Sequence, residues 1–236
     1  MAMGKMVGLS RNIKLRWLNK TVEYVLENKS EEEIKEDLND YLSYEIKSKD
    51  NLRKTREILS NIWVYSKTKQ PELHQRALNL IEKYPDDVLG IHWCMMLLAY
   101  PVLSDLSVLF SNLSEYQEEI TLSQIKNKMF DEWGERTTLF HSLDKIIQTL
   151  KDMEILYSEK PGRYKVVKHA VDHKEIVNFM VLAALYLQNG AYYSVSDLSH
   201  IKQFFAFDYS IDRTSLFEEE NIVVSNFGGN QTVSLR

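Results

Sequence analysis

The fold is decided by residues 121–168, which read TLSQIKNKMFDEWGERTTLFHSLDKIIQTLKDMEILYSEKPGRYKVVK. Apolar side chains recur every three or four positions on both sides of Gly134, which predicts two helices joined by a glycine turn. Two short stretches rich in Ile, Leu, Tyr and Val follow at 154–158 and 164–168. We therefore expect a β-hairpin after the second helix, with a basic turn at 159–163.

Helical spacing continues on both sides of this stretch. A helix expected from residue 102 to about 116 precedes it, and the order helix, helix, glycine turn, helix and hairpin is typical of a winged helix-turn-helix. The C-terminus predicts a second, terminal β-hairpin from residues 222–225 and 232–235. The same helical spacing recurs in residues 10–28, 30–42, 51–62, 72–84, 86–100 and 174–189.

These patterns predict a mainly α fold with a helical N-terminal region, a winged helix-turn-helix and a short C-terminal β-hairpin. We expect a helical N-terminal domain over residues 1–100 that contains a helix-turn-helix-like basic helix. A winged-helix module follows over 101–170. Residues 171–236 supply a C-terminal helix and the terminal hairpin, which pack on the rest.

The composition points to a soluble chain of the reducing cytoplasm. The chain has 236 residues, of which 27% are charged, and a single cysteine, Cys94, which excludes an intramolecular disulfide. The longest apolar stretches, 91–103 and 176–187, fall short of the ~20 residues that cross a bilayer. We therefore expect a cytoplasmic protein that does not contact a membrane.

Catalytic motifs are missing from the sequence, which contains no phosphate-binding loop, nucleophile elbow or zincin motif. Cys94 lies in an apolar run beside Trp93 and predicts an inert core thiol. His169 and His173 have the spacing of one helical turn and could in principle hold a metal, but no full ligand set accompanies them. We expect a protein that is not an enzyme and holds neither a cofactor nor a metal.

Basic residues are unevenly distributed along the chain, although the overall formal charge is −5. Residues 1–70 carry +3 and residues 121–170 carry +2, whereas 71–120 carry −6 and 171–236 carry −4. The two basic segments are the ones that resemble nucleic-acid readers, so we expect local, salt-dependent contact with duplex DNA.

The candidate contacts belong to three elements. The recognition helix and the turn before it present Arg136, Thr137, Thr138, His141, Lys145 and Gln148 toward a groove. The wing brings Lys160, Arg163 and Lys165 to phosphates or a minor groove. A second cluster at the start of the helix near residue 51 contains Lys49, Arg53, Lys54 and Arg56, where an ordinary lysine-rich helix face is the competing interpretation.

The N-terminal half resembles a known family. Residues 30–34, Ser-Glu-Glu-Glu-Ile, followed by the basic residues 51–59, Asn-Leu-Arg-Lys-Thr-Arg-Glu-Ile-Leu, resemble the opening of BrxA, the small helical protein of BREX phage-resistance operons. The resemblance extends over roughly the first 150 residues. It implies a non-enzymatic DNA-binding accessory of a multi-gene bacterial defence system.

Two functional classes follow from these patterns. The first is a winged-helix protein that binds duplex DNA together with other proteins of a defence or regulatory complex, with homo-oligomerisation left open. The alternative is an assembly adaptor that uses the winged helix to dock proteins without nucleic acid.

Overall fold

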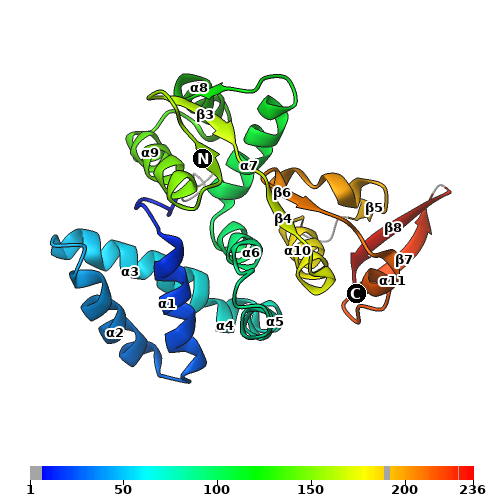
Figure 1. The fold of residues 1–236 in the computed structure, drawn as a ribbon, viewed down its shortest axis with the longest axis horizontal. Coiled ribbons are helices and arrows are strands. Elements are labelled where there is room, and N and C mark those ends of the chain that lie inside the picture. Colours follow the sequence, from blue (N-terminus) through cyan, green and yellow to red (C-terminus); the bar gives the residue numbers. More distant parts are fainter. Residues whose placement is uncertain (1–6, 189–191, 228) are drawn as a thin grey trace.

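The computed structural model describes residues 7–188, 192–227 and 229–236, and it is mainly helical (Figure 1). The N-terminal helices α1 to α3 lie at one end, and the C-terminal strands β5, β7 and β8 lie at the other (Figure 1). The helices are α1 (Leu15–Leu26), α2 (Glu31–Ser43), α3 (Lys49–Trp63), α4 (Ser66–Lys69), α5 (Pro71–Lys83), α6 (Leu89–Ala99), α7 (Pro101–Ser114), α8 (Leu122–Trp133), α9 (Thr137–Asp152), α10 (Lys174–Leu187) and α11 (Arg213–Phe217), with short 3₁₀ turns at Asp197–His200 and Lys202–Phe204.

Short strands form three small sheets within the described residues. The strands are β1 (Ile120–Thr121), β2 (Leu156–Tyr157), β3 (Arg163–Val166), β4 (His169–Val171), β5 (Tyr193–Ser194), β6 (Phe207–Tyr209), β7 (Ile222–Phe227) and β8 (Asn230–Leu235). One sheet has the order β1-β3-β2, a second pairs β4 with β6 in parallel, and a third has the order β5-β8-β7.

The expected C-terminal hairpin is confirmed, since β7 and β8 pair antiparallel with Ile222 opposite Leu235. The sequence did not predict that β5 would add a third strand to this hairpin. It also missed the parallel pair of β4 and β6, in which His169 lies opposite Phe207. Three-residue strands carry too little periodicity to be recognised, and the two members of this pair are 38 residues apart in sequence.

The apolar core runs without interruption from the first described segment to β8. Helix α6 lies at its centre, because residues 90–97 are all buried, and it packs against α3, α5, α7 and α10. Among the described residues, no helix alone has the length and apolarity to cross a membrane. The pair α6 and α7 meets that test jointly but bends by 117° at its break. The three-part domain division stays a prediction.

Helix α1 begins at Leu15, five residues later than expected from Ser10. The preceding segment is held in an irregular path by tertiary contacts, including a hydrogen bond from the Ile13 N–H to Thr149 Oγ1 at 2.9 Å. Gly8 adopts a φ of 70°, and a Cβ there would lie 2.9 Å from the Tyr100 ring. A contact with α9, remote in sequence, thus removes the first turn that the local pattern predicted.

Two other helices begin away from their expected residues. Helix α3 starts at Lys49 because Ser48 caps it, accepting from the Asn51 N–H at 3.4 Å. Helix α6 starts at Leu89 rather than residue 86, because a turn closed by the Asp87 N–H and the Tyr84 carbonyl at 3.1 Å precedes it.

Candidate nucleic-acid interface

The start of helix α9 is set by helix α8 and the glycine turn that precede it. Helix α8 begins with a capping box in which Thr121 Oγ1 accepts from the Gln124 N–H and Gln124 Oε1 accepts from the Thr121 N–H. It ends at Gly134, whose φ of 78° is the left-handed region that glycine tolerates. The chain therefore turns sharply before Thr137, where α9 begins as predicted.

The hairpin after α9 folds back onto the strand before α8. Strand β3 lies between β1 and β2, with Thr121 opposite Arg163 and Tyr157 opposite Lys165. The connection between β2 and β3 turns at Gly162, whose φ is 74°, and the Leu122 N–H donates to the Gly162 carbonyl at 2.9 Å. Arg163 is therefore the first residue of β3, not part of the turn as expected.

The two faces of α9 differ in character. Its apolar face is buried and includes Leu139, Leu143, Ile146, Ile147 and Leu150. Its outer face exposes five of the predicted contact residues, and the sixth, Arg136, is half-buried at the N-cap. The exposed five are Thr137, Thr138, His141, Lys145 and Gln148.

The C-terminal end of α9 is tied to the segment that precedes α1. Asn12 Nδ2 donates to Asp152 at 2.8 Å, and Gln148 Nε2 donates to the same carboxylate at 2.7 Å. Thr149 is fully buried beneath this contact. Gln148 is thus exposed but already donates a hydrogen bond to Asp152, whereas Lys145 forms no ion pair with a described residue.

Two of the three predicted contact cations in the hairpin expected to be a wing are paired with glutamates outside the predicted contact set. Arg163 Nη1 lies 3.1 Å from Glu119 Oε2, and Lys165 Nζ lies 2.6 Å from Glu118 Oε1. The hydrogen bond to Glu118 raises the pKa of Lys165, and the same bond lowers the pKa of Glu118. Lys160, exposed in the connection between β2 and β3, has no such partner within the described residues.

These pairs change the charge of the predicted interface. Residues 121–170 contain nine lysines and arginines against seven acidic residues. Adding Glu118 and Glu119, which the fold places against β3, brings the balance to zero. In the sequence, the only indication of this neutralisation is that Glu118 and Glu119 directly precede β1, which is a strand of only two residues.

Phe140 is a second feature missed from the sequence. It lies in the first turn of α9 with its side chain 42% exposed, and Lys126 Nζ lies 3.6 Å from its ring centroid. Lys126 also pairs with Asp144 at 2.7 Å. Phe140 directly follows the buried Leu139, so the apolar spacing of α9 does not by itself show that the Phe140 ring is exposed.

The second predicted cluster surrounds Asp50 at the start of α3. Lys54 lies 2.7 Å, Arg53 3.1 Å and Arg11 3.7 Å from this carboxylate. Hydrogen bonds from Lys54 and Arg53 lower the pKa of Asp50. Lys49 is exposed beside them, so the N-terminal end of α3 keeps a clear positive excess.

Arg56 lies apart from this group. Its guanidinium contacts Glu57 at 2.8 Å and Asn39 at 3.1 Å, and its side chain is 18% exposed. It therefore joins α2 to α3 instead of extending the exposed cluster.

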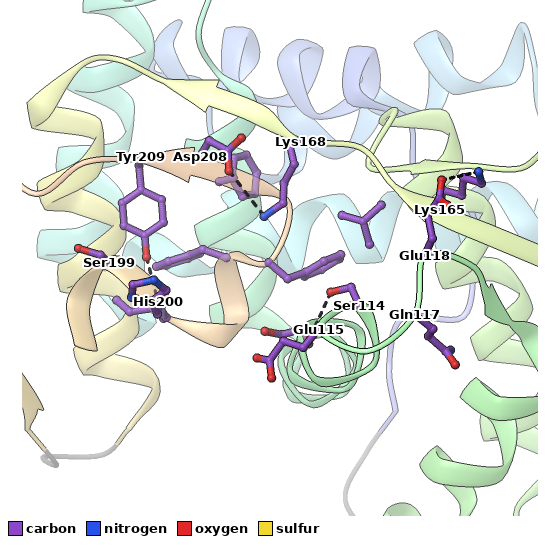
Figure 2. A pocket seen from close by; sticks show the side chains of 16 residues that line it. Ser114, Glu115, Gln117, Glu118, Lys165, Lys168, Ser199, His200, Asp208 and Tyr209 are labelled. Atoms are coloured by element: carbon purple, nitrogen blue, oxygen red, sulfur yellow. Dashed lines mark hydrogen bonds and ion pairs between the residues drawn. The ribbon is translucent and has the colours of Figure 1, made fainter. Parts of the chain in front are cut away.

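A cleft of about 640 Å³ lies beside strand β3 (Figure 2). Its lining includes Phe204, Phe205 and Phe207, which are buried. Figure 2 shows the Lys165–Glu118 pair at one end of the cleft, Lys168 near Asp208 along its edge, and Ser199, His200 and Tyr209 at the opposite end. The cleft and the wing therefore share the same ion pair.

His169, His173 and Cys94 lie in structural positions. His169 is in β4 and His173 is the residue at the N-cap position of α10, so the two do not share a helix face although their spacing is that of one helical turn. Among the described residues, no three His, Cys, Asp or Glu side chains are grouped so that they could hold a metal ion. Cys94 is fully buried, and burial raises its pKa well above the ordinary value.

No protein-family model, curated protein or solved structure matches the chain.

Proposed function

We propose that the chain binds duplex DNA through a winged helix-turn-helix formed by α7, β1, α8, α9, β2 and β3. The observation that carries the proposal is the element order combined with the strand order β1-β3-β2, which leaves the polar face of α9 outermost. A winged helix inserts the corresponding helix into the major groove.

The side chains on that face have the chemistry of base-edge readers. Lys145 can donate to guanine O6 and N7, and Gln148 can pair with adenine N6 and N7 once it leaves Asp152. Thr137, Thr138 and His141 supply shorter donors and acceptors near the start of the helix. Lys160 is the wing cation that meets phosphates without first losing a partner.

A second phosphate contact is proposed at the N-terminal end of α3, through Lys49, Arg53 and Lys54. Helices α1, α2 and α3 pack on one another, and α3 presents these cations at its first turns. Residues 11 and 12 connect this cluster to α9, because Arg11 lies near Asp50 while Asn12 binds Asp152. One duplex extending past the end of α9 would therefore meet both surfaces.

The test is a fluorescence-anisotropy titration of a labelled 30-base-pair duplex of random sequence at 50 and 200 mM salt. The double variant Lys145→Gln with Lys160→Gln is expected to weaken binding and to lower the salt slope by about one, because only Lys160 of the two is assigned a phosphate. Lys67→Gln is the matched control, since Lys67 is exposed in α4 with no ion pair to a described residue. Equal binding by the wild type, the double variant and the control would refute α9 and the wing as the contact surface.

The adaptor alternative is favoured by aromatic rings exposed in the same module. Phe140 is 42% exposed in α9 and Tyr157 is 56% exposed in β2, and aromatic anchors are typical of protein interfaces. A partner that co-purifies regardless of salt and is lost with Phe140→Ser, while the duplex does not bind at low salt, would replace DNA binding with docking.

The setting we propose is the one that the BrxA resemblance implies, a non-enzymatic accessory of a cytoplasmic phage-defence complex. It is tested by plaque assays on cells carrying the complete gene cluster with either the wild-type chain or the Lys145→Gln, Lys160→Gln variant. Equal protection by the two would separate this chain's DNA binding from defence.

A further inference from the structure

We infer that Glu118 and Glu119 act as an acidic clamp, an internal competitor that holds Arg163 and Lys165 away from DNA phosphates and so sets how tightly the chain binds DNA. The inference rests on the proposed DNA-binding function. It concerns two residues outside the predicted contact set and assigns them a regulatory role.

The geometry of the clamp follows from the register of the sheet. Ile120 lies opposite Tyr164 and Thr121 opposite Arg163, so the chain just before β1 runs alongside the second half of β3. The Glu118 carboxylate thereby lies 2.6 Å from Lys165 Nζ, and the Glu119 carboxylate lies 3.1 Å from Arg163 Nη1. Each cation has its own carboxylate, which makes the neutralisation one to one.

The exposure of the four side chains allows exchange with a phosphate. Glu118 is 80% exposed and Arg163 55% exposed, while Lys165 and Glu119 are about one third exposed. Pairs in such surroundings contribute little to stability because water and salt screen them. A DNA phosphate can therefore displace either carboxylate, and the displacement reduces the gain from each contact.

The clamp acts on affinity and not on sequence preference. Contacts from α9 to base edges are unaffected by the clamp, whereas the sequence-independent phosphate contacts of the wing are weakened. The clamp therefore lowers binding to random DNA and to a sequence that α9 reads by the same factor. Lys160, which has no carboxylate partner among the described residues, remains available for initial contact.

The experiment compares the wild type with Glu118→Gln, Glu119→Gln in the anisotropy titration on the random duplex. Each freed cation is expected to steepen the salt slope by about 0.9 and to tighten binding about fivefold at 0.15 M salt. Glu115→Gln is the matched control: Glu115 is exposed at the end of α7 and forms no ion pair with a described residue, so it changes net charge without opening the clamp. Equal thermal midpoints of all variants would establish that folding is unchanged.

A double-mutant cycle separates the clamp from a general charge effect. In a Lys165→Gln background, Glu118→Gln should no longer tighten binding, because the cation it would free is absent. If the wild type binds but the clamp variant behaves like Glu115→Gln, or the Glu118→Gln effect persists without Lys165, the clamp is refuted and the proposed function stands. If neither wild type nor clamp variant binds the duplex at 50 mM salt, the proposed function fails and the clamp fails with it.

Discussion

His92 offers a prediction whose size follows from its surroundings. Its ring is fully buried in α6, accepts a hydrogen bond at Nδ1 from Trp63 Nε1 at 3.1 Å, and lies with Nε2 2.8 Å from Asn19 Oδ1. Because Trp63 can only donate, Nδ1 has no proton, and Nε2 must donate to the amide oxygen. The folded protein therefore requires a neutral His92, and burial lowers its pKa from 6.5 to about 3.

The lowered pKa of His92 determines how the stability of the protein changes with pH. Below pH 6.5 the unfolded chain binds a proton at residue 92 that the folded chain does not, so stability is complete above pH 6.5 and is lost as the pH falls toward 3. The loss approaches about 1.4 kcal/mol per pH unit once the unfolded histidine is fully protonated. His74, buried and 2.9 Å from Ser66 Oγ, has its pKa lowered to about 4 by burial and adds a second proton in the same direction.

The perturbation is His92→Gln, which removes the titration while keeping a donor near Asn19. Urea denaturation at pH 7.5, 6.5, 5.5 and 4.5 should show a variant that is less stable at pH 7.5 by about 1–3 kcal/mol, because Trp63 loses its acceptor. As the pH falls from 5.5 to 4.5, the variant should lose about 1.4 kcal/mol less stability than the wild type.

The control is Thr138→Ala on the exposed face of α9, which changes no titratable group and should leave the slope unchanged. A constant difference in stability between wild type and His92→Gln from pH 7.5 to 4.5 would refute the assignment of His92 as a neutral, buried group.

Three further substitutions test other contacts by thermal or urea denaturation. Thr121→Ala removes the cap of α8 and should cost about 1 kcal/mol, and rescue by Ser would identify the hydroxyl as the cause. Thr149→Val leaves the buried Ile13 N–H without an acceptor and should cost about 1–3 kcal/mol; an unchanged midpoint would mean that the N-terminal segment does not depend on this bond. Arg76→Met removes the bidentate partner of the largely buried Glu219 and should cost about 2 kcal/mol, with no loss expected when Glu219 is replaced by Gln in the same variant.

Local sequence patterns predict much of the segment that contains the candidate interface. Gly134 fixed the turn before α9 because its backbone conformation, φ 78°, suits glycine, and Thr137 began the helix where apolar spacing resumed. The terminal hairpin was equally visible, because β7 and β8 are long enough to show strand composition on both sides of a glycine turn. Such features depend on residues within a few positions of one another.

Contacts between remote segments could not be predicted in the same way. The start of α1 was misplaced because Ile13 bonds to Thr149, 136 residues away. Arg56 was grouped with exposed cations because its helix is basic, although Asn39 and Glu57 hold it at the junction of α2 and α3. Neither outcome leaves a local trace, since Thr149 and Asn39 each belong to another element of the fold.

Local sequence patterns predict the long helices, the position of the glycine turn and the polar face of α9, but not the short helices α4 and α11. The charge of the candidate interface depends instead on the folded arrangement, which places Glu118 and Glu119 against Arg163 and Lys165. Periodicity and capping act within one or two helical turns, whereas ion pairing depends on distance in space and is set only once β1 has paired with β3.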